Sequence, residues 1–405
     1  MLAPSLSFKF RNEPNKMQSA ALSAMLTDFC QLFNACLEQR IDAWRRSSLY
    51  GSSSLTTFSW IGAPSPRMRI EGSSSGRSTT MRTITLEEHF ATPRFLDGPG
   101  RELKQQAEKF SNARALRLIP QLCDLGDKRI AEMDAAGIDM QIVSLTAPGV
   151  EQLEAAEAIA LAAETNDFVA DAIKKHPGRF GAFAALPTAV PDKAAQELDR
   201  RVRGQKFAGA IINGHNRGRY LDDKFFWPIL ESAEQLGATI YLHPTRPPQP
   251  VIDASFSGFS PETSEMFSGP GWGWHIETAV HVIRLILGGV FDRFPKLQIV
   301  IGHLGEGIPG MFQRLDIMAP AVTKLKRPVT AYLRENIHYT FSGFFFPPTF
   351  LALLLELGGV DRMMFSVDHP YQSMAEGRAF LEQLPVSTAD KERIAHGNAE
   401  KLFKL

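Results

Sequence analysis

Eight short strand-like runs separated by helix-like segments constrain the fold of this chain more than any other feature of its 405 residues. The runs are rich in β-branched and aromatic residues and are found at 83–89, 140–146, 180–187, 207–213, 238–244, 297–303, 337–343 and 363–370. Helical patterns lie between them, at 151–175, 191–203, 223–236 and 275–291. Strict alternation of strand and helix indicates a parallel sheet, and eight such units are typical of a closed barrel. The sequence therefore predicts an α/β fold, a (β/α)8 TIM barrel.

An open, doubly wound sheet is the competing architecture for such a pattern. That fold normally carries a glycine-rich phosphate-binding turn directly after its first strand. Here the first strand runs into EEHFATPRF at residues 87–95, which contains no glycine. The closed barrel is therefore the preferred prediction.

The first 80 residues differ in composition from the rest of the chain. They carry nine Lys and Arg against five Asp and Glu, and they include the serine-rich runs SSLYGSSSLTTFS and EGSSSGRSTT. No apolar pattern is sustained there, although the sequence allows one short amphipathic helix over 26–44. We expect residues 1–80 to be a disordered low-complexity extension or a gene-model artefact, with the functional chain starting at Met81. An organellar transit peptide is disfavoured because such peptides are poor in acidic residues.

The overall composition disfavours several classes of partner. Lys and Arg together number 44, as do Asp and Glu, so no net charge attracts nucleic acid or an anionic membrane. No run reaches the roughly 20 consecutive apolar residues that a membrane-spanning helix needs. Cys30, Cys36 and Cys123 have the spacing of neither a disulfide framework nor a zinc knuckle. We expect free thiols in a soluble, cytoplasmic protein that binds a small ligand.

Polar side chains stand at the ends of four of the predicted strands. Glu87 and His89 end the first strand, His243 the fifth, His303 the sixth and Asp368 the eighth. Active sites of TIM barrels form at the carboxyl ends of the strands, so these five side chains are predicted to converge. Taken singly, each would more often cap a helix or make a buried hydrogen bond. Their joint occurrence at strand ends favours one shared site.

The types of side chain at these strand ends indicate a metal. Glu87, His89, His243 and Asp368 offer two imidazole nitrogens and two carboxylates, which suit Zn²⁺ or Mn²⁺ better than Ca²⁺ or Mg²⁺. We therefore predict one divalent metal ion with open coordination positions.

His303 is followed by another acidic residue after three positions. The carboxylate of Glu306 is able to hold the second ring nitrogen of His303 and so select its tautomer. A simple hydrogen bond within the loop is the alternative interpretation of this pair.

Four motifs, LEEHF, YLHP, FDRFPKLQIVIGHLGEGIP and MMFSVDHPY, occur in this order between residues 86 and 371. Together they resemble the metal-dependent aromatic acid decarboxylases of the amidohydrolase superfamily. That group includes γ-resorcylate, 2,3-dihydroxybenzoate and 5-carboxyvanillate decarboxylases, with aminocarboxymuconate semialdehyde decarboxylase as a more distant relative. The resemblance spans roughly residues 83–404, and it implies a metal-dependent TIM-barrel decarboxylase domain over 81–405.

The resemblance also implies an activity and roles for individual residues. The activity is the non-oxidative decarboxylation of a small hydroxyaromatic carboxylic acid, which releases CO2 and protonates the ring carbon. The metal ligands are expected to be Glu87, His89, His243 and Asp368. Asp368 is also expected to protonate the ring, with His303 and Glu306 assisting at the substrate. Relatives are dimers or tetramers, so we expect a homodimer or homotetramer.

Several further residues are candidates for contact with a flat substrate ring. The aromatic candidates are Phe90, Trp272, Trp274 and Phe344, and the match to relatives adds Arg314, near the site or at a subunit contact. The Pro- and Gly-rich segment 245–274 is expected to cover the mouth of the barrel as a lid. The apolar run 344–355 fits either a subunit interface or the core. His369 departs from the family pattern, in which an aromatic residue commonly follows the aspartate.

Two other functions are compatible with the same residues. Metal-dependent hydrolysis of an amide or lactone uses related ligands in the same superfamily. Decarboxylation is favoured because the first strand carries E-x-H instead of H-x-H and because no strand ends in a lysine that could bridge two metals. A non-catalytic, metal-dependent binding scaffold is the second alternative.

Overall fold

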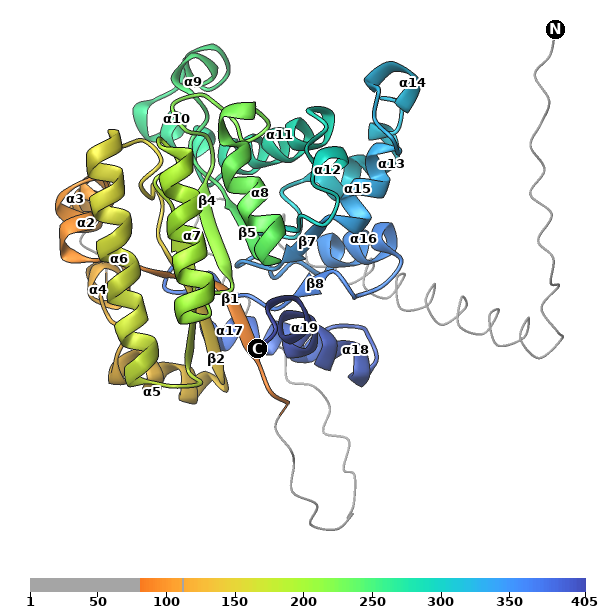
Figure 1. Ribbon diagram of the computed structural model, residues 1–405. Coiled ribbons are helices and arrows are strands. Elements are labelled where there is room, and N and C mark those ends of the chain that lie inside the picture. Colours follow the sequence, from red (N-terminus) through yellow and green to blue (C-terminus); the bar gives the residue numbers. More distant parts are fainter. Residues whose placement is uncertain (1–80, 111–112) are drawn as a thin grey trace, which may run out of the picture. The chain divides into compact units, whose positions relative to one another are not determined.

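Eight parallel strands form one sheet in the computed structural model, which describes residues 81–110 and 113–405 (Figure 1). The strands are β1 (Ile84–Phe90), β2 (Met140–Leu145), β3 (Phe180–Ala185), β4 (Gly209–Asn213), β5 (Thr239–His243), β6 (Ile299–Ile301), β7 (Ile337–Thr340) and β8 (Met363–Met364). Each strand pairs with the next along the chain, and a parallel bridge between Leu86 and Ser366 joins the two edges of the sheet. The predicted TIM barrel is therefore confirmed.

Helices connect successive strands and surround the barrel (Figure 1). In its first half these are α2 (Pro93–Asp97), α3 (Arg101–Phe110), α4 (Ala113–Leu122), α5 (Asp127–Ala136), α6 (Ala155–Lys175), α7 (Pro191–Gln205), η1 (Lys224–Phe226) and α8 (Trp227–Leu236). After β5 come α9 (Gln249–Ser255), α10 (Pro261–Ser268), α11 (Gly273–Leu287) and α12 (Val290–Arg293). The remainder are η2 (Ile308–Met311), α13 (Phe312–Leu315), α14 (Pro320–Thr323), α15 (Val329–Glu335), α16 (Pro347–Leu357), α17 (Met374–Gln383), α18 (Thr388–Glu392), η3 (Arg393–Gly397) and α19 (Asn398–Phe403).

Local sequence explains where several of these helices begin and end. The side chains of Thr92, Ser260 and Ser373 cap α2, α10 and α17 by accepting a hydrogen bond from a backbone N–H in the first turn. Gly237 and Gly358 end α8 and α16 in the left-handed conformation, which glycine adopts without the penalty that a Cβ would bring. The alternation of strand and helix is thus encoded by short-range signals.

The apolar residues form two separate clusters. The larger cluster lies between the strands and the surrounding helices and includes Phe90, Leu145 and Leu198. The smaller cluster includes Ile84, Ile142 and other buried side chains and contains residues from seven of the strands. Burial of both clusters fixes the strands, and therefore the residues that follow them, relative to one another.

The segment between β5 and α11 contains two short helices. These are α9 and α10, and they lie within residues 245–274, the segment that is expected to cover the mouth of the barrel. Ser260 and Pro261 provide the start signal for α10 within this Pro- and Gly-rich stretch. The segment exposes Phe259, Met266 and Trp272, which are 59%, 56% and 52% accessible.

The predicted helix over 26–44, Cys30, Cys36 and the proposed origin of residues 1–80 lie outside the described residues. Cys123 is half-buried, and it is a free thiol. Among the residues that the structure describes, no helix has both the length and the apolar character needed to cross a membrane.

His338, in β7, gives a pH-dependent prediction for stability. Arg362 donates a hydrogen bond to His338 Nε2 at 2.8 Å, and burial, reinforced by Arg362 and Lys401, lowers the pKa of His338 to about 3. In the unfolded chain the pKa of histidine is about 6.5, so unfolding takes up a proton between these two values and stability falls as pH falls. Between pH 7 and pH 5, His338 should contribute about 2 kcal/mol to this loss. Urea unfolding at both pH values should show a smaller loss for His338→Gln than for the native protein, and equal losses would contradict the prediction.

Candidate active site

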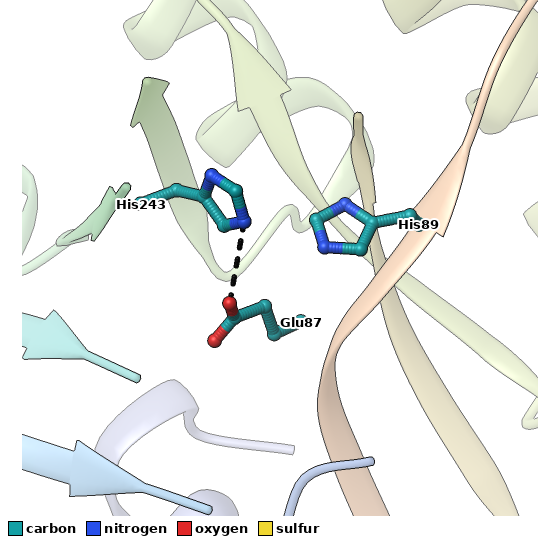
Figure 2. Close-up of side chains that lie close together, drawn as sticks. All are labelled: Glu87, His89 and His243. Carbon is teal, nitrogen blue, oxygen red and sulfur yellow. Dashed lines mark ion pairs between the residues drawn. The ribbon is translucent and has the colours of Figure 1, made fainter. Parts of the chain in front are cut away.

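Glu87, His89 and His243 form a buried triad at the carboxyl ends of β1 and β5 (Figure 2). His243 Nε2 lies 3.3 Å from Glu87 Oε1, and the rings of His89 and His243 meet edge to face at 4.9 Å. One potential ligand atom from each residue lies within 4.8 Å of the other two. The structure thus brings together three of the four predicted metal ligands in a space that suits one cation.

The polar atoms of the triad are buried without the partners that such atoms usually have. Within the described part of the chain, Glu87 Oε1 and both ring nitrogens of His89 make no hydrogen bond. A buried polar atom in this situation costs about 1–3 kcal/mol, so the arrangement calls for a ligand. A divalent cation of borderline hardness satisfies carboxylate oxygen and imidazole nitrogen together. The donor set therefore fits a metal.

An irregularity in β1 places Glu87. The register between β1 and β2 shifts between Thr85 and Glu88, and Glu87 has φ of 57°, in the left-handed region. Such a bulge re-aims the side chain of the residue that it contains. Backbone strain of this kind is typical of functional sites, where the surrounding structure holds it in place.

The tautomer of His243 is selected by its neighbour in the chain. His243 Nδ1 lies 2.8 Å from the carbonyl oxygen of Pro244. A carbonyl oxygen only accepts hydrogen bonds, so Nδ1 carries a proton and Nε2 is the ring nitrogen that faces Glu87. This is the usual way in which a second hydrogen bond prepares a histidine to bind a metal.

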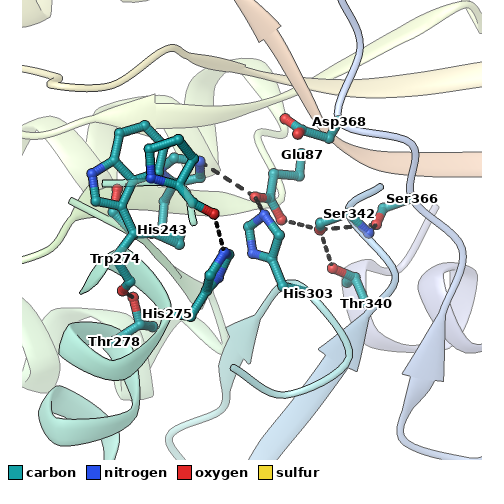
Figure 3. Close-up of polar contacts among 12 residues, drawn as sticks. Glu87, His243, Trp274, His275, Thr278, His303, Thr340, Ser342, Ser366 and Asp368 are labelled. Carbon is teal, nitrogen blue, oxygen red and sulfur yellow. Dashed lines mark hydrogen bonds and ion pairs between the residues drawn. The ribbon is translucent and has the colours of Figure 1, made fainter. Parts of the chain in front are cut away.

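Asp368 lies at the edge of the triad, beyond the end of β8. Its Oδ1 is 3.1 Å from His89 Nε2, and its side chain is 15% exposed. Figure 3 shows Asp368 beside Glu87. The fourth predicted ligand is thus adjacent to the other three, and it is the most accessible of the four carboxylate and imidazole groups.

The second oxygen of Glu87 accepts hydrogen bonds from neighbouring hydroxyl groups. Tyr241 and Ser342 both donate to Glu87 Oε2, and Tyr241 also contacts Thr340 Oγ1 at 2.7 Å. A Cβ on Gly302 would lie 2.4 Å from Glu87 Oε2, so only glycine leaves room for the carboxylate at that position. Burial raises the pKa of Glu87, but His303 and His243 outweigh it and hold the pKa well below its usual range. Glu87 is therefore an oriented carboxylate.

His303 approaches the triad from the loop after β6 (Figure 3), and Glu306 follows it in the same loop. His303 Nδ1 donates to Glu306 Oε1 at 2.7 Å, which leaves His303 Nε2 facing Glu87 Oε1 at 3.9 Å. Residues 303–307 all have positive φ, a left-handed turn that aims both side chains inward. Burial lowers the pKa of His303, but the carboxylates of Glu306 and Glu87 prevail and raise it to about 10. These two carboxylates therefore favour the charged form of His303.

A second histidine completes this arrangement. His275, from the first turn of α11, lies with its Nδ1 2.6 Å from Glu306 Oε2 and its Nε2 3.1 Å from the carbonyl oxygen of Pro270. The rings of His275 and His303 are 4.7 Å apart. Glu306 thus bridges two imidazoles. In the sequence, His275 is only the first residue of the helical pattern at 275–291. Its place in the candidate site becomes evident from its contact with Glu306 in the structure.

Of the predicted substrate-contacting residues, Phe344 lies beside the site. Its ring centroid is 4.9 Å from that of His275 and 5.1 Å from that of His303. Phe90 is elsewhere, because it stacks on Phe168 of α6 at 6.0 Å within the outer core. The alternation of side chains along β1 turns Phe90 away from the face that carries Glu87.

The structure also locates the other candidate residues for substrate contact, together with His369. Trp274 is half-buried next to His275, whereas Trp272 is 52% exposed. Arg314 is exposed on α13. His369 is buried, with its Nε2 3.8 Å from Glu132 Oε2 of α5, so its ring points toward the helix layer.

Two tyrosines at the site were not predicted from the sequence. Tyr371 contacts Thr146 Oγ1 through its hydroxyl group at 2.7 Å and lies edge-on to His89 at 5.4 Å. Tyr241 precedes His243 by two positions in β5, so the period of a strand was a signal that both face inward. No comparable signal in the sequence linked Tyr371 to His89.

Known proteins are similar to this chain over about four-fifths of its length. The amidohydrolase family profile matches residues 118–405. The chain belongs to the amidohydrolase family. A γ-resorcylate decarboxylase from Polaromonas sp. (strain JS666 / ATCC BAA-500) is 36% identical over 334 residues, which cover 80% of this chain and 98% of that protein. The predicted family membership is thereby confirmed.

Two solved structures of amidohydrolase-like decarboxylases align with the barrel. A dihydroxybenzoic acid decarboxylase from Polaromonas sp. JS666, with bound manganese and the inhibitor 2-nitroresorcinol, has a TM-score of 0.71 and 36% identity, covering 80% of this chain and 97% of that chain. A 5-carboxyvanillate decarboxylase from Novosphingobium aromaticivorans DSM 12444, complexed with manganese and 4-hydroxy-3-methoxy-5-nitrobenzoic acid, has a TM-score of 0.73 and 34% identity, covering 82% and 98%.

Proposed function

We propose that this protein is a metal-dependent carboxy-lyase that removes CO2 from a small hydroxyaromatic carboxylic acid without oxidation. The observation that carries the proposal is the buried triad of Glu87, His89 and His243 with Asp368 at its edge. It occurs in a chain that matches γ-resorcylate decarboxylase over 98% of the length of that enzyme. The decarboxylase names of this relative and of the two similar solved structures favour this activity over the hydrolase alternative.

Glu87, His89, His243 and Asp368 are the proposed ligands of one divalent ion. Manganese in two similar decarboxylases supports Mn²⁺, and Zn²⁺ is the alternative that the nitrogen and oxygen donors also suit. A bound ion would supply positive charge beside the substrate's carboxylate and ortho phenol oxygens, which would help to orient the ring and withdraw negative charge from it.

Asp368 is the proposed acid. Its carboxyl group delivers a proton to the ring carbon that bears the carboxylate, and the carbon–carbon bond then breaks. The electron pair of that bond returns to the ring, which restores aromaticity as CO2 leaves. General acid catalysis of this kind is typically worth 10²–10⁴-fold in rate.

His303 is the proposed source of that proton. Its Nε2 faces the triad while Glu306 holds its Nδ1, so the ring is oriented to pass a proton toward Asp368 or the substrate phenol. His275 shares the other oxygen of Glu306 and thereby fixes the carboxylate. Phe344 lies against both imidazoles and is the proposed support for the flat ring of the substrate.

We further propose a cytoplasmic homodimer or homotetramer with no nucleic acid or membrane partner. Exposed apolar side chains on η2, α14 and α16, and in the segments next to them, support self-association, since such surface is usually covered by a partner. These side chains are Met311, Ile317, Val322, Phe346, Leu351 and Leu355. Arg314, exposed on α13 in the same region of the sequence, is the proposed polar member of this contact. The free thiol of Cys123 fits a reducing compartment.

Release of CO2 from a defined set of acids tests the proposed activity. With Mn²⁺ added, the enzyme should release CO2 from at least one of 2,6-dihydroxybenzoate, 2,3-dihydroxybenzoate and 5-carboxyvanillate. In D2O the product should carry one deuterium at the carbon that lost the carboxylate, as measured by NMR. 4-Hydroxybenzoate, which lacks an ortho phenol, is the matched control and should be inert. Hydrolysis of an aryl lactone with no CO2 from any ortho-hydroxy acid would instead support the hydrolase alternative.

A further inference from the structure

We infer that Glu88, the second carboxylate of the LEEH sequence, is a positioning residue that holds the backbone on both sides of Asp368. The inference rests on the proposed role of Asp368 as acid and metal ligand. Glu88 is fully buried and lies between two proposed ligands, Glu87 and His89. It is not among the ligands, because its contacts lead to the opposite side of β1.

Both carboxylate oxygens of Glu88 accept a hydrogen bond from the backbone. Its Oε1 accepts a hydrogen bond from the backbone N–H of Val367 at 2.9 Å, and its Oε2 accepts one from the backbone N–H of His369 at 3.1 Å. These two N–H groups belong to the residues directly before and after Asp368. One carboxylate is therefore hydrogen-bonded to the backbone of both neighbours of the proposed acid.

Asp368 needs such a support because the sheet does not supply one. The ladder of β8 ends at Met364, and Asp368 has φ of 73°, in the left-handed region that residues with a side chain seldom adopt. Holding a residue other than glycine there costs of order 1–3 kcal/mol, which the surroundings must offset. A hydrogen bond from His89 N–H to the carbonyl oxygen of His369, at 2.7 Å, adds a third tie between β1 and this loop.

A buried network orients Glu88 in turn. Gln141 Nε2 donates to Glu88 Oε2 at 3.4 Å, and Arg129 Nε donates to Gln141 Oε1 at 2.7 Å. Arg129 Nη1 also donates to the carbonyl oxygen of His89 at 2.7 Å. The network thus connects the backbone of one proposed ligand, His89, with the backbone around another, Asp368.

The energetics favour a positional role over a stabilising one. Glu88 is wholly inaccessible and Arg129 is 1% exposed, so both ionisable groups are removed from water. Burying such groups is costly, and apolar side chains of similar volume are often as stabilising or more so. What apolar side chains cannot do is accept two backbone hydrogen bonds at fixed positions. Glu88 does accept two such hydrogen bonds, from the backbone N–H groups of Val367 and His369.

Glu88→Gln is the principal test. Glutamine has nearly the same size but replaces one acceptor oxygen by a donor, so one of the two N–H groups beside Asp368 loses its partner. We expect kcat for CO2 release to fall roughly 10–100-fold, the usual effect of losing a partner behind a metal ligand, with little change in KM. The electron paramagnetic resonance spectrum of bound Mn²⁺ should change, because Asp368 shifts. Amide hydrogen exchange in a peptide spanning 365–370 should accelerate even without metal.

Glu151→Gln is the matched control. Glu151 is also fully buried and accepts from a backbone N–H, that of Asn213 at 2.8 Å, but this contact does not adjoin Asp368. Its loss should reduce thermal stability without changing the Mn²⁺ spectrum or the exchange of residues 365–370. Glu88→Asp, which retains the charge opposite Arg129, provides a second variant if Glu88→Gln does not fold, and should show the same changes to a smaller degree.

The outcomes separate this inference from the proposed function. A folded Glu88→Gln or Glu88→Asp protein with native kcat, native Mn²⁺ spectrum and native exchange at 365–370 would overturn the inference. If the native protein releases no CO2, the proposed function fails, yet the exchange and the Mn²⁺ spectrum still report whether Glu88 holds Asp368.

Discussion

Asp368→Asn is expected to lower kcat for CO2 release by roughly 10²–10⁴-fold, the range that a positioned general acid usually contributes. The amide has the shape of the carboxyl group but cannot deliver a proton to the ring carbon. Glu87, His89 and His243 remain as three ligands, so Mn²⁺ should still bind. Single-turnover kinetics together with metal analysis of the same sample measure both quantities.

Asp361→Asn is the matched control for this substitution. Asp361 precedes β8, its side chain is 72% exposed, and its contact is an ion pair with Arg393 at the surface. An exposed pair of this kind contributes little, so activity and fold should stay close to native. If Asp368→Asn retained a rate within about threefold of native, a loss below the roughly 10²-fold minimum for a general acid, Asp368 would have no part in proton transfer.

Removal of the metal is expected to abolish CO2 release and to lower thermal stability, and added Mn²⁺ should restore both. The reason is that Glu87 Oε1 and the His89 nitrogens, which make no hydrogen bond within the described residues, would gain a bonding partner in the ion. A ligand present at 100 times its Kd stabilises the folded state by about 2.7 kcal/mol. Thermal unfolding after dialysis against a chelator, with and without Mn²⁺, measures this shift.

Glu87→Gln distinguishes a specific site from general metal binding. The amide keeps the volume of the Glu87 side chain beside the hydroxyl groups of Tyr241 and Ser342. It removes the negative charge with which Glu87 would bind the metal. Mn²⁺ should then fail to raise the unfolding temperature or to restore activity. A variant that responds to Mn²⁺ as the native protein does would place the metal elsewhere.

Much of the candidate site was predictable because its residues are marked by local spacing. Glu87 and His89 are two positions apart on one strand, and His303 and Glu306 are three apart in one loop, so each pair was expected to face one point. The convergence of these pairs with His243 follows from the barrel, in which all parallel strands end at one rim. Each of these residues could be predicted from its own strand or loop together with the fold class.

Phe90 illustrates where local spacing was insufficient. As an aromatic residue next to His89 it was a reasonable candidate for substrate contact, but adjacent residues on a strand point to opposite faces. In the structure it stacks on Phe168 in the outer core. The same alternation turns Glu88 away from the metal ligands and toward Val367 and His369.

The amino-acid sequence by itself determined the number and order of the strands, the helices between them, the family, and the set of side chains at the strand ends. These depend on interactions within a few residues, which β-branched runs, caps and glycines encode directly. Only the tertiary structure decided that His275 shares Glu306 with His303, that hydroxyl groups from β5 and the end of β7 contact Glu87, and that Glu88 accepts hydrogen bonds from both neighbours of Asp368. Such contacts join residues between 31 and 281 positions apart, and their geometry exists only when the barrel closes and the helices dock against it.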